Sequence, residues 1–222
     1  MKVISVDVAR ATWLFPTVEL NPTGRSLTKA FLGLAERYNF KTFPKHTLDA
    51  DPEAKGLVFN QGEFKNKEGQ NVLVKLTVFA DGVVSDSWSS TRDSEDLLRD
   101  AMLWMKTEHG FSIPAERAMK TFYLSQLTVA ADTNSSLINP KFKALADFIA
   151  AKTTETGRPN VGFTFAGFSM WAKDWDKPHA PAPYRFEIKA GSSPEENRYF
   201  ASAALPTDIH LAVLEEQERL LG

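Results

Sequence analysis

The sequence predicts an α+β fold made of two units with the same order of elements. Two stretches, residues 72–105 and residues 184–221, each have the pattern of a β-hairpin that leads directly into an amphipathic helix. Upstream of each lie a strand, a helix and a Gly-containing aromatic strand. We therefore expect two β-α-β-β-β-α units, residues 1–110 and 111–222, at a period of about 110 residues, the size of a small domain.

The first hairpin and helix are marked by alternation, turn residues and a cap. Residues 72–80 alternate between an apolar and a mixed face, as in a strand. Asp81-Gly82 predicts a tight type I′ turn, in which both central residues have positive φ. Ser90 or Thr91 is placed to cap the next helix, and His109-Gly110 to end it. Helical spacing then predicts one buried face, formed by Leu97, Leu98, Ala101, Met102, Trp104 and Met105.

The second unit repeats these steps with different residues. Residues 184–190 alternate, residues 191–194 form a turn, and residues 199–205 return toward a helix capped by Thr207. Asn139-Pro140 is a strong helix start, because Asn caps and Pro at the first helical position loses no hydrogen bond. We expect that helix to bury Phe142, Leu145, Phe148 and Ile149.

The helices need a sheet face to bury their apolar stripes, so we expect antiparallel sheet with the helices packed on one face. The opposite face would then be open. In its duplicated helices on a sheet, the expected fold resembles TATA-binding-protein-like folds, and its strand order resembles longin-like and roadblock-like units. This likeness concerns the fold alone, no family is recognised, and a fold does not imply a function.

Composition limits the classes of function. The formal net charge is −2 and each half of the chain is nearly balanced, so no basic run of the kind used by nucleic-acid binders is visible. The chain has no cysteine, which excludes disulfides, thiolate metal sites and a cysteine nucleophile. No apolar run is long enough for a membrane span or a signal peptide, and we expect a cytoplasmic protein.

The partner-binding candidates are aromatic residues and one lysine. The proline-rich loop 174–183 interrupts the second unit where the first has a short turn, and added loops often carry function. Trp175 in this loop, with Trp171 and Lys173 just before it, is a candidate contact of the type that dominates binding interfaces. Phe79 and Trp88 are candidates on the open sheet face.

Catalytic and metal sites have weak support. Asp174, Asp176 and His179 could hold a divalent ion, but their spacing matches no known motif. The chain also lacks the phosphate-loop, nucleophile-elbow and HExxH patterns. We therefore expect no cofactor and no bound metal, and we regard an enzyme as unsupported.

The function favoured by the sequence is that of a non-enzymatic interaction module, a scaffold, adaptor or inhibitor. It would bind a protein partner or self-associate as a homodimer, through the open sheet face or the 174–183 loop. A small-ligand module, or one that stacks single-stranded nucleic acid on the aromatic face, is the first alternative. A metal-dependent hydrolase around Asp174, Asp176 and His179 is the second.

Overall fold

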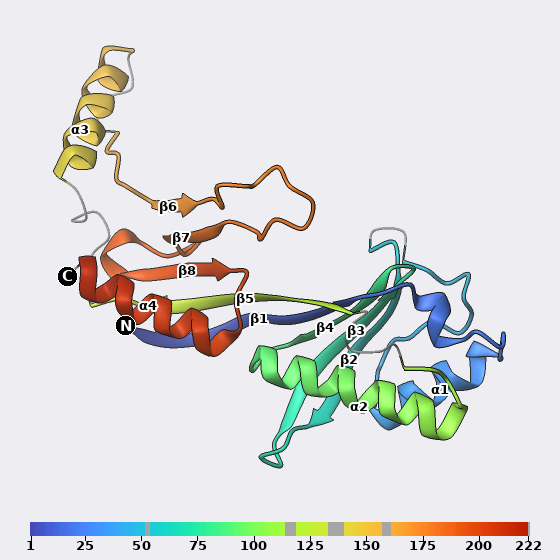
Figure 1. The fold of residues 1–222 in the computed structure, drawn as a ribbon. Coiled ribbons are helices and arrows are strands. Elements are labelled where there is room, and N and C mark those ends of the chain that lie inside the picture. Colours follow the sequence, from blue (N-terminus) through green and yellow to red (C-terminus); the bar gives the residue numbers. More distant parts are fainter. Residues whose placement is uncertain (52–53, 114–118, 133–139, 157–160, 222) are drawn as a thin grey trace. The chain divides into compact units, whose positions relative to one another are not determined.

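A computed structural model of the chain describes residues 1–51, 54–113, 119–132, 140–156 and 161–221. In these residues an eight-stranded sheet is combined with four α-helices (Figure 1), which confirms the α+β class. The expected cap Asn139, and the end of the following helix at Gly157, lie outside the described residues.

The order of elements occurs twice, as predicted. The first set is β1 (Lys2–Leu14), α1 (Leu27–Arg37), β2 (Leu57–Lys65), β3 (Asn71–Phe79), β4 (Gly82–Ser87) and α2 (Thr91–His109). The second is β5 (Lys120–Ala130), α3 (Pro140–Glu155), β6 (Gly167–Met170), β7 (Tyr184–Ile188), β8 (Arg198–Ala203) and α4 (Thr207–Leu221). Short 3-10 helices span Thr17–Leu20 and Pro194–Glu196. The strand order β2-β3-β4-β1-β5-β8-β7-β6 reads the same from both ends when corresponding strands are matched.

The chain contains two compact units, each assembled from separate segments. The first unit comprises residues 6–125 and 205–208, and the second comprises residues 1–5, 126–204 and 209–222. Neither unit is continuous in sequence, and their boundaries do not fall at residue 110. The division into residues 1–110 and 111–222 describes the repeated order of elements, and as a division into domains it stays a prediction.

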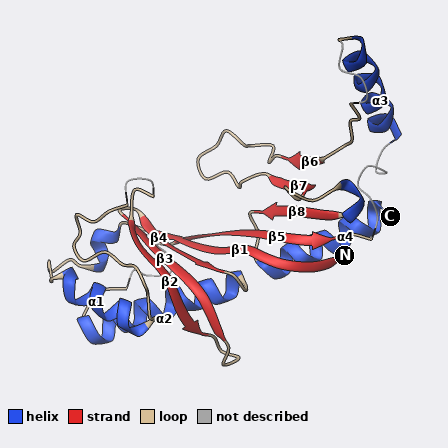
Figure 2. Ribbon diagram, turned by 180° about the vertical axis from the view of Figure 1, so that it is seen from behind, coloured by secondary structure: helices blue, strands red, loops and turns tan. Residues whose placement is uncertain are grey.

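In the first unit, α1 and α2 cover one face of the strands β2 to β4 (Figure 2). The buried side chains of Phe31, Leu34, Leu97 and Leu98 come from the two helices and meet strand residues such as Val74. Alternation within the strands sends every second side chain to this face. Most of the stripe expected in α2 is therefore buried, while Trp104 and Met105 are partly buried.

The β3–β4 turn differs from the expected type. Phe79 pairs with Gly82, so the turn residues are Ala80 and Asp81. Neither Asp81 nor Gly82 has positive φ, so the type I′ prediction is wrong. Gly82 is required for space, because a Cβ there would lie 2.4 Å from the Trp13 carbonyl oxygen.

The first strand ends where the chain turns around the β3–β4 hairpin. β1 ends at Leu14, and residues 17–20 are a 3-10 helix instead of more strand. Phe15 N–H donates to Asp81 O at 3.0 Å, and Thr17 Oγ1 donates to Phe79 O at 2.9 Å. These bonds turn the chain around the end of the β3–β4 hairpin, which stops the extension of β1.

The ends of α2 were predicted correctly. The Ser90 side chain accepts a hydrogen bond from Asp93 N–H at 3.1 Å. Gly110 is left-handed with φ 65°, its N–H donates to Lys106 O, and Phe111 N–H donates to Met105 O. The bond from Gly110 N–H to Lys106 O is that of an αL C-cap, and both bonds occupy helix carbonyls that would otherwise lack partners.

The prediction that α3 buries its apolar stripe is wrong. Phe142, Leu145, Phe148 and Ile149 remain 40%, 52%, 60% and 38% exposed. Phe142 stacks on Phe165 with ring centroids 4.5 Å apart. The periodic pattern identifies a helix with an apolar side, but burial also requires a covering surface, which the described residues do not supply for most of this stripe.

Candidate binding sites

The two tryptophans predicted to contact a partner are exposed and touch each other. Trp171 follows β6 directly and is 61% exposed, and Trp175 is 64% exposed. Their rings meet edge to face, with centroids 6.2 Å apart. Lys173 between them is also exposed. Both rings are thus accessible at the surface, and their role in partner binding stays a prediction.

Local bonds hold the loop after this pair in shape. Lys177 Nζ pairs with Asp174 Oδ2 at 3.0 Å, and Lys177 N–H donates to Asp174 O at 3.0 Å. His179 adopts φ 64°. Among the described residues, no three His, Asp or Glu side chains form a group that could hold a metal ion. Asp174, Asp176 and His179 are thus not brought together as a metal site, and Asp174 is engaged by a lysine.

Phe79 and Trp88, the two candidates for the open sheet face, lie at or beyond the ends of their strands. Trp88 lies just beyond the end of β4 and is 46% exposed. Phe79 ends β3, is half-buried, and lies against Gly56, where a Cβ would be 3.0 Å from its ring. Phe79 also lines a cavity, described below. It is therefore less accessible to a partner than an open-face residue would be, and its role in partner binding stays a prediction.

The open face of the first unit carries a neutralised charge pair. Arg10 on β1 faces Asp86 on β4, and its guanidinium donates to both carboxylate oxygens at 2.5 and 2.9 Å. This bidentate bond with Asp86 raises the pKa of Arg10. A cation held in this way is less available to a phosphate, because binding would have to break the pair.

An apolar cavity of about 500 Å³ lies in the first unit, between its helices and its sheet. Its walls are side chains of α1, α2 and strands β2 to β4, among them Phe31, Val83, Leu98 and Met105. The 3-10 helix at 17–20, residues 55–57 and Phe111 complete the lining. This volume lies in the range of small-molecule sites.

The polar groups at the edge of the cavity are mostly engaged with the protein itself. Thr17 Oγ1 is bonded to Phe79 O, while the Asn21 amide accepts from Arg25 N–H and donates to Arg25 O, both at 2.8 Å. Lys55 is the charged residue in the lining. It is exposed, and no ion pair to it is formed by the residues that the structure describes.

The free-energy cost of an empty cavity indicates whether a space of this size can stay unfilled. At roughly 24 cal/mol per Å³, an enclosed empty void of about 500 Å³ would cost about 12 kcal/mol. The whole stability of a domain is about 5–15 kcal/mol. Since native interiors are close-packed, a cavity of this size is compatible with a stable fold when solvent or a ligand enters it.

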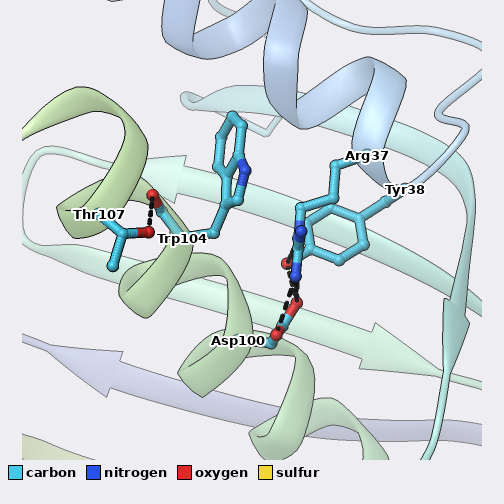
Figure 3. A network of polar contacts seen from close by, with 5 residues as sticks. All are labelled: Arg37, Tyr38, Asp100, Trp104 and Thr107. Carbon is cyan, nitrogen blue, oxygen red and sulfur yellow. Dashed lines mark hydrogen bonds and ion pairs between the residues drawn. The ribbon is translucent and has the colours of Figure 1, made fainter.

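A polar network joins the two helices that form one wall of the cavity (Figure 3). Arg37 at the end of α1 makes a forked bond to Asp100 on α2, at 3.1 and 2.9 Å, and Tyr38 Oη donates to Asp100 Oδ2 at 2.6 Å. Burial and the bond to Asp100 raise the pKa of Tyr38 well above its usual value. The Arg37 guanidinium also lies 5.9 Å from the Trp104 ring centroid. The helices are thereby fixed to each other independently of the apolar contacts.

Sequence reasoning missed the cavity for a physical reason. Each apolar residue in the lining has the same spacing as an ordinary core residue, so periodicity cannot separate a wall from a filled core. Ligand binding was expected between the two copies or on an aromatic face, whereas this cavity lies within the first unit.

Comparisons with known proteins assign no family. No family model matches the chain, and no curated protein matches it. Among solved structures, Methanococcus jannaschii TBP aligns with 99% of this chain and 97% of its own, at 13% identity and a TM-score of 0.45. A likeness this weak carries no argument about function. No helix in the described residues is long and apolar enough to cross a membrane, and the predicted cytoplasmic location stays a prediction.

Proposed function

We propose that this chain is a non-enzymatic interaction module that binds a protein partner, or a second copy of itself, through the Trp171–Trp175 pair. The observation that carries the proposal is the exposure of both rings, 61% and 64%, at the start of an ordered loop. Tryptophan is enriched among residues that dominate interface energy, because a large rigid ring buries much area at little entropic cost.

Other exposed apolar residues in the sequence before the pair support this proposal. Seven further large apolar side chains exposed in the described residues lie from Phe142 to Met170, among them Phe163. Single exposed apolar residues are normal in soluble proteins, but a concentration of them indicates an interaction region. The charge of Lys173 between the rings would add orientation more than affinity.

A photo-crosslinking amino acid at position 173 tests the proposal in the native cell. Position 173 lies between the two rings and is exposed, so the crosslinker can reach a bound partner without removing either ring. We expect a discrete adduct whose mass identifies either one partner or a second copy of this chain. The adduct should be lost in the double variant Trp171→Ala, Trp175→Ala.

The matched control carries the crosslinker at Leu48, which is 92% exposed and far from the pair in sequence. We expect no discrete adduct there. Equal adducts at positions 48 and 173, or an adduct at 173 that survives loss of both tryptophans in a folded variant, would show that the pair is not the interface.

Small-molecule binding is a second candidate function, favoured by the apolar cavity of about 500 Å³ in the first unit. The two candidates use different residues, so they are compatible in one protein. Single-stranded nucleic acid remains an alternative partner class without a specific observation in its favour.

A further inference from the structure

We propose that the cavity of the first unit binds a single-chain amphiphile with a carboxylate head, a fatty-acid-like molecule whose tail lies among the apolar walls and whose head meets Lys55. This assignment rests on small-molecule binding, the second candidate function, and specifies its ligand. It concerns the space lined by residues of α1, α2, β2, β3 and β4.

The walls define the tail of the ligand. Phe31, Leu34, Leu98 and Met102 are at most 9% exposed, and all are apolar side chains that line the same space. None of the described residues in this part of the lining is charged, so a polar ligand would lose its hydration without gaining partners. A hydrocarbon tail loses nothing on entry and removes apolar surface from water.

Lys55 determines the head. It is the charged residue among the described residues of the lining, and these include no Asp or Glu that would neutralise it or attract a cation. The backbone fixes its place at the rim, since Lys55 has φ 54° and its N–H donates to Asp51 O at 2.7 Å. A lysine ammonium donates up to three hydrogen bonds, and a carboxylate accepts them with charge assistance.

Two other polar side chains at the rim, those of Thr17 and Asn21, are already bonded within the protein. Thr17 Oγ1 is bonded to Phe79 O and Ala80 O at 2.9 and 3.0 Å, and both atoms of the Asn21 amide are bonded to Arg25. A neutral head such as an alcohol would therefore find fewer free partners than an anionic head. The combination of the Lys55 ammonium at the rim and the apolar walls favours a ligand with an anionic head and a hydrocarbon tail.

Titration calorimetry with three ten-carbon probes, decanoate, decan-1-ol and decylamine, tests the assignment on the full chain. We expect saturable one-to-one binding in the order decanoate, decanol, decylamine. Lys55→Gln should weaken decanoate by about tenfold, the loss typical of a charge-assisted hydrogen bond, and leave decanol unchanged. The matched control Lys120→Gln, an exposed lysine of the same unit outside the cavity, should change neither.

Two blocking variants show whether binding occurs in the cavity. Ala101→Phe places a ring in the interior, where Ala101 is 4% exposed. Ala80→Trp blocks the edge from an exposed position, so it preserves the fold if the interior variant does not. Each folded variant should abolish binding of both decanoate and decanol.

The results distinguish a failure of the carboxylate assignment from a failure of small-molecule binding itself. If all three probes bind equally and the blocking variants abolish binding, the cavity is a small-molecule site but the carboxylate assignment is overturned. If no probe binds, or if binding survives in both folded blocking variants, the assignment and the second candidate function both fall.

Discussion

His210 on α4 is a buried imidazole without a hydrogen-bond partner in the described part of the chain. Its exposed fraction is 0%, and neither Nδ1 nor Nε2 has a partner there. The ring of Tyr184 meets it edge to face, with centroids 6.0 Å apart. Burial disfavours the charged form and lowers the pKa of His210 to about 4. The folded protein therefore holds this ring neutral well below the pH at which an unfolded histidine is protonated.

This shift makes stability depend on pH. Between about pH 6.5, the usual pKa, and about pH 4, the unfolded chain binds a proton that folded His210 does not, so stability falls as the pH falls. We expect His210→Leu to remove this component. Urea unfolding of both proteins at a series of pH values should show the variant gaining stability relative to the native chain as the pH falls from 6.5 to 4. A difference that stays constant across this range would mean that His210 titrates alike in both states.

Single residues also show what a local pattern can and cannot predict. Ser90 and Gly110 were recognisable as caps because a cap depends on its own helix. Gly82 was predicted to lie in the turn, whereas it is the first residue of β4. Its lack of a side chain is required by the Trp13 carbonyl, and that contact arises from pairing of β1 with β4, which local sequence does not encode.

Among the elements, α2 and α4 begin at residues that bond reciprocally. Thr91 N–H donates to Thr207 Oγ1 at 3.0 Å, and Thr207 N–H donates to Thr91 Oγ1 at 2.9 Å. The two hydroxyl oxygens are 3.3 Å apart, and both residues are buried. Thr91 and Thr207 hold corresponding positions in the two repeats, so each helix start supplies the acceptor that the other lacks.

A double-mutant cycle measures this reciprocity. Thr91→Val and Thr207→Val should each cost about 1–3 kcal/mol, because each leaves a buried N–H unpaired. The double variant should cost less than the sum by about 1 kcal/mol, since the shared hydroxyl contact is lost once and not twice. Thr107→Val is the control: its hydroxyl is exposed and bonds within α2 to Trp104 O, and we expect less than about 0.5 kcal/mol. Strict additivity would show that the two hydrogen bonds act independently.

The exposed stripe of α3 gives a second test at this scale. Leu145 and Phe148 are 52% and 60% exposed, so Leu145→Gln and Phe148→Gln should change the free energy of unfolding by less than about 0.5 kcal/mol. Leu97→Ala in α2, where the side chain is 0% exposed, should cost about 2–5 kcal/mol. Urea unfolding of the three variants checks both expectations. A loss at Phe148 as large as that at Leu97 would mean that the α3 stripe is buried after all.

At the scale of the whole molecule, the repeated order of elements could be predicted from the sequence. The candidate binding sites could be predicted only in part. Alternation and helical spacing, with cap residues, are encoded locally, and they gave the α+β class and the order of elements. Trp175 could be singled out as a candidate contact because it lies outside the strand pattern, in the proline-rich loop. The cavity and the exposure of α3 depend on which surfaces meet, and residues such as Phe148 and Leu98 have the same apolar character whether they are covered or not.

The interleaved units predict how fragments behave. The first unit extends to Ser125, and it includes Phe111, which is 5% exposed, and Tyr123, whose hydroxyl donates to Glu95 Oε2 at 2.9 Å. A fragment of residues 1–110 lacks both contacts, although it contains a full β-α-β-β-β-α set. We expect residues 1–125 to give a dispersed NMR spectrum and a cooperative urea transition, and residues 1–110 to give neither.

The longer fragment should still be less stable than the full chain, because it lacks Thr207, the acceptor for Thr91 N–H. That loss should be about 1–3 kcal/mol, the size expected for Thr207→Val in the full chain. Two fragments with equal transitions would place the folding boundary at residue 110, where the repeat in the sequence puts it, and would show that the contacts of Phe111 and Tyr123 are dispensable for the first unit.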